Sequence, residues 1–194
     1  MLIDAAGRHG AEWIVALDAD ERVERDFRQR ADAEMDRADR DGHLAYSLIL
    51  RELWETPDHY RIDDTWGRKR IVRLFRFRRD HDFGAQALHG HWAPENSRAV
   101  NGEWPTADLI LYHLRMILPE HREQRKQRYV TLDPHRRWQS IGYEYLTDDR
   151  ELRLETFPPG RDYTPLGVEE CVRPQPPTSA CPDVTATQVA AVPI

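Results

Sequence analysis

The amino-acid sequence predicts an α/β fold in which a mixed sheet is flanked by helices. Three observations support this class: the apolar run 13–17 suits a strand, residues 70–78 alternate as a strand does, and residues 119–132 begin with Pro at the first helical turn. The length of 194 residues suits one domain, and a hydrophobic content of 40% suffices for a core.

The most informative stretch is W-I-V-A-L-D-A-D-E at residues 13–21. Its continuous apolar run is typical of a strand buried on both faces of a parallel sheet. Asp18 and Asp20 would then project to one side of an extended chain, about 7 Å apart. The two carboxylates would lie at the C-terminal edge of the strand, where open α/β sheets bind their ligands. They therefore suit Mg²⁺ or Mn²⁺ with a nucleotide diphosphate. The alternative is that both aspartates begin the next helix, as Asp favours helix N-termini.

The other expected elements follow along the chain. They are a helix end at 1–10, a charged helix at 21–41 stopped by Gly42, a strand at 43–50, a polar excursion at 54–66, the strand at 70–78, an apolar strand or helix start at 109–114, the helix at 119–132 and an aromatic segment at 138–146 that docks on the core.

The strand at 70–78 carries several arginines, and they admit two interpretations. Their guanidinium groups could bind phosphate through paired hydrogen bonds. More often such a strand pairs with acidic neighbours at the surface, and that interpretation is favoured here.

The segment A-E-W-I-V-A-L-D-A-D-E-R-V at 11–23 resembles the metal-binding D-x-D region of family 2 glycosyltransferases, which have the GT-A fold and transfer sugar with inversion. In the same order as in bacterial members, L-H-G-H-W at 88–92 resembles the acceptor-side histidine motif, L-Y-H-L at 111–114 a late histidine, and the 119–132 helix with Asp133-Pro134 the closing helix. A weak match continues to about Tyr163. The resemblance implies a GT-A-like, Rossmann-like sheet.

The resemblance also implies roles for particular residues. Asp20 would bind the metal directly, Asp18 would meet the ribose or the metal through water, and His113 would complete the diphosphate site. A general base must take the proton of the acceptor hydroxyl. The family often has Glu directly after the first histidine of the acceptor motif, where this chain has Gly90.

The base therefore stays open among His89, His91 and Glu95. For each histidine a structural role is an alternative, either as a hydrogen-bonded loop residue or, for His113, as a satisfied core residue.

One departure concerns the N-terminus. Family members place a first βαβ unit, which holds the nucleotide base, before the D-x-D strand, whereas about a dozen residues precede it here. We therefore expect residues 1–160 to form a partial GT-A domain without that unit, either as a fragment or as a degenerate protein. Residues 161–194 are rich in Pro and predict a disordered tail.

These observations predict transfer of a sugar from a nucleoside-diphosphate sugar to a glycan, lipid or small-molecule acceptor, with Mn²⁺ or Mg²⁺ as cofactor. One alternative is a non-catalytic remnant or binding module that lacks the site for the donor base. Another is a metal-dependent phosphohydrolase that uses the same aspartates.

Composition narrows the partners and the location. The net charge of −6 gives no basic footprint for nucleic acid. No apolar run approaches the about 18 residues of a transmembrane helix, and the expected location is cytoplasmic. Basic side chains of the 119–132 helix leave peripheral contact with an anionic membrane open, although interleaved glutamates favour a solvated face. Cys171 and Cys181 lack metal-ligand spacing and are assigned no chemistry.

Overall fold

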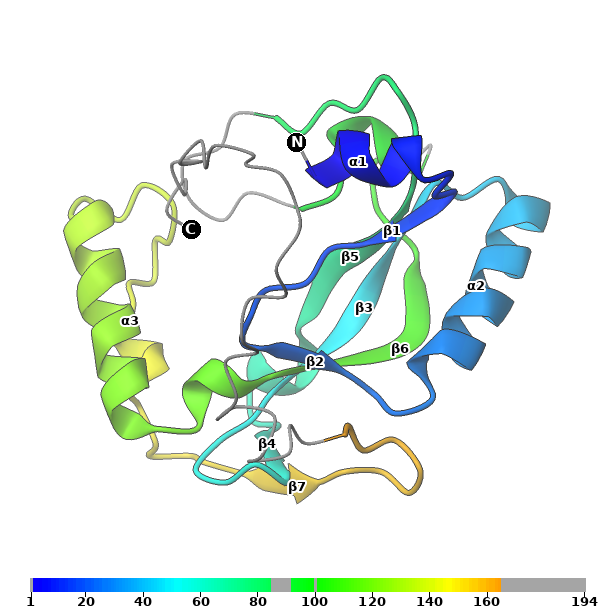
Figure 1. The fold of residues 1–194 in the computed structure, drawn as a ribbon. Coiled ribbons are helices and arrows are strands. Elements are labelled where there is room, and N and C mark those ends of the chain that lie inside the picture. The colour runs from blue at the N-terminus through cyan, green and yellow to red at the C-terminus, as the bar shows by residue number, and fades with distance from the viewer. Residues whose placement is uncertain (1, 85–91, 100, 165–194) are drawn as a thin grey trace, which may run out of the picture.

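A computed structural model describes residues 2–84, 92–99 and 101–164 and confirms the mixed α/β class. A curled five-stranded sheet has the order β1-β5-β3-β6-β2, and α2 and α3 lie on opposite sides of it (Figure 1). A two-stranded sheet of β4 and β7 lies below the main sheet in that view. The elements are α1 Leu2–Arg8, β1 Trp13–Val15, β2 Glu21–Val23, α2 Phe27–Asp41, β3 Ala45–Glu52, β4 His59–Arg61, η1 Trp66–Arg68, β5 Arg70–Arg76, η2 Glu95–Ser97, β6 Thr106–His113, η3 Leu114–Met116, α3 Pro119–Leu132, η4 Glu144–Leu146 and β7 Leu154–Thr156.

The central pair of the sheet, β3 and β6, is parallel, and every other pairing in it is antiparallel. Glu52 pairs with His113 in the parallel register, so the carboxyl ends of β3 and β6 meet at one edge. This is the edge at which open α/β sheets bind ligands.

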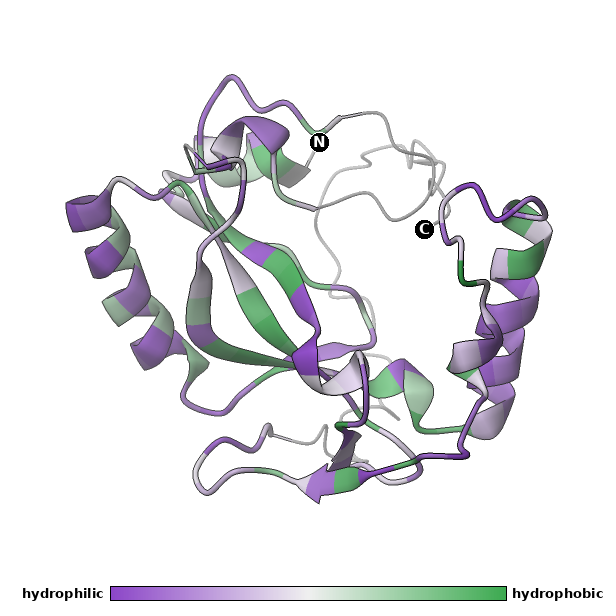
Figure 2. Ribbon diagram, turned by 180° about the vertical axis from the view of Figure 1, so that it is seen from behind, coloured by the Kyte–Doolittle hydropathy of each residue, from purple (hydrophilic) through white to green (hydrophobic). Residues whose placement is uncertain are grey.

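Apolar side chains of α2 pack on the sheet and form its largest core cluster. Phe27, Ala31 and Ala38 contact inward-facing residues of β3, β5 and β6. Figure 2 shows these central strands as mostly hydrophobic, while α2 alternates hydrophobic and hydrophilic residues along its length. The helix ends at Gly42, as expected, because Gly42 adopts a left-handed conformation with φ of 73°.

Helix α3 packs elsewhere, through a second aromatic cluster. Tyr129 contacts Tyr143 of the aromatic segment, at 5.1 Å between ring centres, and both belong to a cluster with Trp54 and Trp66. The bounds and the initial Pro of this helix match the prediction. The expected solvated face is wrong for Arg122, which is buried, donates to the carbonyl of Met116 and stacks on Trp54.

Two predictions about the first strands are wrong. The strand predicted for 13–17 spans only Trp13–Val15 and lies at the end of the sheet, antiparallel to β5, so Val15 and Leu17 stay exposed rather than buried on both faces. The helix predicted from residue 21 begins at Phe27, because residues 21–23 form β2 and pair with the end of β6. Pairing of residues 21–23 with β6 thus outweighs the local preference of acidic residues for the start of a helix.

The chain from residue 161, assigned to the tail by its sequence, is packed at its beginning. Arg161 forms ion pairs with Glu24 and Asp108, and the buried Tyr163 donates from its hydroxyl to the carbonyl of Pro57. Residues 165–194 lie outside the described residues.

Gly67 in η1 provides a test of this packing. A Cβ at this position would collide with the backbone carbonyl oxygen of Ile62, so Gly67→Ala should lower the free energy of unfolding by about 1–3 kcal/mol. Urea denaturation measures this. Gly10→Asn is the control: nothing lies within 4 Å of a Cβ there, and Asn tolerates its φ of +75°. Equal stability of Gly67→Ala and wild type would contradict the close approach.

Candidate functional site

Residues 18–21 form a turn rather than the expected extended segment. The backbone N–H of Glu21 donates to the carbonyl of Asp18 at 3.0 Å, and the backbone N–H of Asp18 donates to the Glu21 carboxylate at 2.9 Å. The extended geometry predicted for Asp18 and Asp20 is therefore wrong, and the two carboxylates contact different partners. The alternative that they begin a helix is wrong as well, because α2 starts only at Phe27.

Asp20 lies beside His113, and these are two of the residues that the resemblance assigned to the metal and diphosphate site. Its Oδ2 is 3.4 Å from His113 Nε2 and 3.6 Å from Arg115 Nη1. The backbone N–H of Leu114 donates to the Asp20 carbonyl at 2.8 Å, which fixes the turn against the end of β6. The hydrogen bond with His113 lowers the pKa of Asp20 to about 2, so this carboxylate is ionised at neutral pH.

His113 is held from its other side by Glu52. Its Nδ1 donates to Glu52 Oε2 at 2.6 Å, within the register that pairs the ends of β3 and β6. Burial opposes a charge on the ring, but the Glu52 carboxylate and the contact with Asp20 outweigh it and raise the pKa of His113 to about 9. The imidazole therefore carries a proton on each nitrogen at neutral pH.

Glu52 is itself compensated by a second cation. Lys69 Nζ donates to Glu52 Oε1 at 2.8 Å and lies 3.7 Å from the centre of the Trp66 ring. Burial alone would raise the pKa of Glu52, but the charges of Lys69 and His113 bring it well below its usual value. A buried carboxylate is tolerable here because both of its oxygens have charged partners.

Arg73 of β5 connects the turn to the sheet. It is 2% exposed, and its Nη2 donates to Asp18 Oδ2 at 2.6 Å and to Glu21 Oε1 at 2.5 Å. Pairing of the strand's arginines with acidic neighbours is thus confirmed for Arg73, and Arg76 likewise pairs with Asp39. The expected surface location is wrong for Arg73, which lies in the interior under the turn.

The predicted catalytic bases are less well placed. His89 and His91 lie outside the described residues. Glu95 lies in η2, where its Oε2 accepts a hydrogen bond from Arg98 Nε at 2.7 Å. Its carboxylate is therefore already paired with a cation.

Sequence reasoning missed Glu52, Lys69 and Arg73 as members of this site. Glu52 was detectable in part, because it lies two residues after the apolar run that ends at Leu50, a signal similar to the one that drew attention to Asp18 and Asp20. The contacts of Arg73 were not detectable, because they depend on which strands become neighbours.

Comparisons of the chain with protein-family models, with curated proteins and with solved structures return no match. Within residues 2–84, 92–99 and 101–164, no group of three or more His, Cys, Asp or Glu side chains is arranged to hold a metal ion. In this same part of the chain, no helix is both long and apolar enough to cross a membrane.

The charge on His113 predicts how stability depends on pH. Because folding raises the pKa of His113 from 6.5 to about 9, its contribution is complete below pH 6.5 and is lost as the pH rises through about 9. The difference in unfolding free energy between wild type and His113→Leu should shrink by about 3 kcal/mol across this window, measured in urea with EDTA present.

The control is His121→Gln, an exposed histidine of α3 that contacts neither carboxylate, and it should keep the wild-type profile. A difference between wild type and His113→Leu that stays constant from pH 6.5 to about 9 would contradict the charged state of His113.

Proposed function

We propose that this chain contains the diphosphate-binding part of a GT-A-like glycosyltransferase, similar to family 2 enzymes, that transfers a sugar from a nucleoside-diphosphate sugar to a glycan, lipid or small-molecule acceptor. The observation that carries the proposal is the meeting of Asp20 and His113. They belong to separate motifs, far apart in the sequence, and their side chains lie 3.4 Å apart where the carboxyl ends of β3 and β6 meet, the kind of edge at which open α/β sheets bind ligands.

The donor atoms of these two residues suit a divalent cation. Adjacent ligands of an octahedral Mg²⁺ ion lie about 3 Å apart, since each is about 2.1 Å from the metal. Asp20 Oδ2 and His113 Nε2 are near this separation at 3.4 Å. Mg²⁺ commonly takes only one or two protein carboxylates and fills its other positions with water and substrate phosphate.

Glu52 occupies the place of a supporting residue for such a site. A metal-binding histidine usually donates its other N–H to a carboxylate, which fixes the orientation of the ring. Glu52 accepts this hydrogen bond at 2.6 Å. Binding of a metal at Nε2 requires that the ring release the proton it now shares with Asp20.

The remaining residues would act around this centre. The bound cation would neutralise charge on the departing diphosphate, which is the usual function of a metal in such transfers. Arg73 holds Asp18 and Glu21, and thereby fixes the turn that presents Asp20. Asp18 stays a candidate for the ribose, and His89, His91 and Glu95 stay candidates for the base.

The test is binding of UDP and GDP with and without Mn²⁺, measured by calorimetry. We expect metal-dependent binding that Asp20→Asn weakens at least tenfold and that Glu52→Gln weakens by about 10–100-fold, as loss of a supporting ligand does. Asp36→Asn, which removes an exposed carboxylate of α2, should bind as wild type does.

Two other results of this binding experiment would favour the alternative functions. Absence of metal-dependent nucleotide binding in the wild type would overturn the proposal in favour of a non-catalytic protein. Release of phosphate from a nucleotide without any acceptor would instead identify a phosphohydrolase that uses the same carboxylates.

A further inference from the structure

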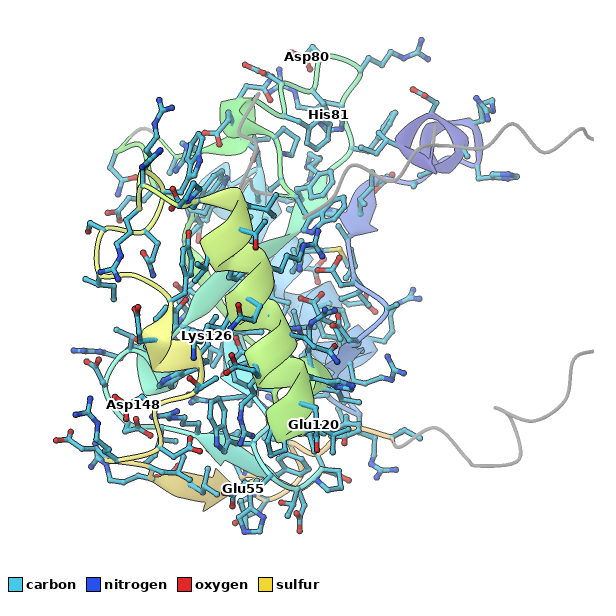
Figure 3. The ribbon with its side chains drawn as sticks, turned by 90° about the vertical axis from the view of Figure 1, so that its left-hand side faces the viewer. Glu55, Asp80, His81, Glu120, Lys126 and Asp148 are labelled. Carbon is cyan, nitrogen blue, oxygen red and sulfur yellow. The ribbon has the colours of Figure 1, made fainter. Side chains whose placement is uncertain are left out.

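A pocket outside the Asp20–His113 site lies where the end of β3 meets η1 and the two-stranded sheet. Its volume is about 480 Å³, and its lining consists of Arg51, Ile62, Asp64, Gly67, Arg68, Arg153 and Glu155. The strands β4 and β7 lie at the end of the molecule that carries Glu55 and Asp148, opposite Asp80 and His81 (Figure 3). Arg51 directly precedes Glu52 in β3, so their side chains project to opposite faces of the strand.

Arg51 is anchored in this pocket without a carboxylate partner among residues 2–84, 92–99 and 101–164. Its Nη1 donates to the carbonyl of Gly67 at 2.9 Å, and its guanidinium lies 4.8 Å from the centre of the Tyr60 ring. Its Nε is buried and has no hydrogen-bond acceptor among the described residues. Nη2 is neither buried nor hydrogen-bonded to a described residue, so it is the donor of this guanidinium that stays available for a planar or tetrahedral oxyanion.

The other arginines of the pocket are also poorly neutralised. The exposed Arg153 side chain forms no ion pair with any described residue, and Arg68 has only a 3.5 Å contact with Asp64, in which both side chains are more than 70% exposed. Such exposed ion pairs have a small interaction free energy. Arg51 and Arg153 thus form no ion pair with an acid among the described residues, although the chain as a whole carries a net charge of −6.

Arg70, at the start of β5, adds to the local excess of positive charge. Burial and the nearby charge of Arg51 both lower the pKa of Arg70. Like charges that repel each other in the free protein favour the binding of an anion, because the anion relieves the repulsion.

We propose that this pocket binds the phosphate group of a hydroxyl-bearing phosphate ester, with Arg51 and Arg153 as its principal cations. The two carboxylates in the lining are the reason for expecting hydroxyl groups on the ligand. Glu155 Oε2 accepts a hydrogen bond from the Tyr60 hydroxyl at 3.1 Å, and Asp64 is largely exposed, so both keep acceptor oxygens for ligand hydroxyls. Inorganic phosphate would offer these carboxylates few hydrogen-bond donors, whereas a sugar phosphate or a polyol phosphate offers hydroxyl donors to them as well as a phosphate to the arginines.

The test is calorimetric titration of the full chain with glucose 6-phosphate, with glucose and with inorganic phosphate, at constant ionic strength and with EDTA present. Saturable binding of glucose 6-phosphate, stronger than that of the other two, is expected. Arg51→Gln/Arg153→Gln should weaken it at least about tenfold, because charge-assisted hydrogen bonds are lost.

Matched variants distinguish binding at this pocket from a general loss of positive charge, from unfolding and from binding at the proposed metal site. Arg79→Gln/Arg137→Gln removes two exposed arginines elsewhere and should bind as wild type does. Arg153→Gln alone removes an exposed side chain that forms no hydrogen bond with the described part of the chain, so this variant should be as stable as wild type and should still bind glucose 6-phosphate more weakly. Asp20→Asn should bind glucose 6-phosphate normally, because this site does not depend on the proposed metal site.

Vesicles of phosphatidylcholine with and without phosphatidylglycerol distinguish a soluble ligand from a lipid headgroup. Binding only to the vesicles with phosphatidylglycerol, abolished in the Arg51/Arg153 variant, would assign the pocket to a lipid, and binding of glucose 6-phosphate without vesicle binding would assign it to a soluble ester. Equal binding by the Arg51/Arg153 variant and by the Arg79/Arg137 control, or no saturable binding of any probe, would overturn the proposal.

Discussion

The hydrogen bond between Glu52 and His113 is the constraint around which the candidate site is organised. It joins the carboxyl ends of β3 and β6, the parallel pair at the centre of the sheet, and both residues are largely removed from solvent. Burial of a carboxylate and an imidazolium is costly unless their remaining atoms are also paired. Lys69 and Asp20 complete this pairing, so the strand ends and the turn before β2 are bound into one charged network.

A second network holds the turn from the other side. Arg73 places one nitrogen between Asp18 and Glu21, and Glu21 also accepts from the backbone of Asp18. Since the turn is fixed at Asp18 and Glu21, Asp20 between them has little freedom to move away from His113. The geometry of the site therefore depends on strand β5 as much as on the D-x-D sequence itself.

Local sequence signals predicted the elements that are governed by local physics. Pro119 marks the start of α3, and Gly42 marks the end of α2 because its left-handed conformation suits glycine. The signal failed at Glu21, where acidic residues favour a helix start but pairing with β6 produces a strand. Tertiary contacts of this kind cannot be read from one segment alone.

The candidate site was predictable to a similar extent. Asp20 and His113 were proposed as site residues from residue type and motif order, and the fold brings their side chains together. The supporting contacts of Glu52 and Arg73 depend on strand neighbours and register, which the sequence pattern does not specify. The basic pocket at Arg51 has the same origin, since its arginines come from β3, η1 and the residue before β7.

The most direct test of the central network is an NMR titration of the His113 ring nitrogens in the full chain with EDTA present. Both nitrogens should be protonated at pH 7, with a pKa of about 9. In Glu52→Gln, which lacks the carboxylate at Nδ1, the pKa of His113 should fall. A wild-type His113 that titrates near the ordinary value of 6.5, or one whose pKa is unchanged by Glu52→Gln, would contradict the role of the Glu52–His113 hydrogen bond.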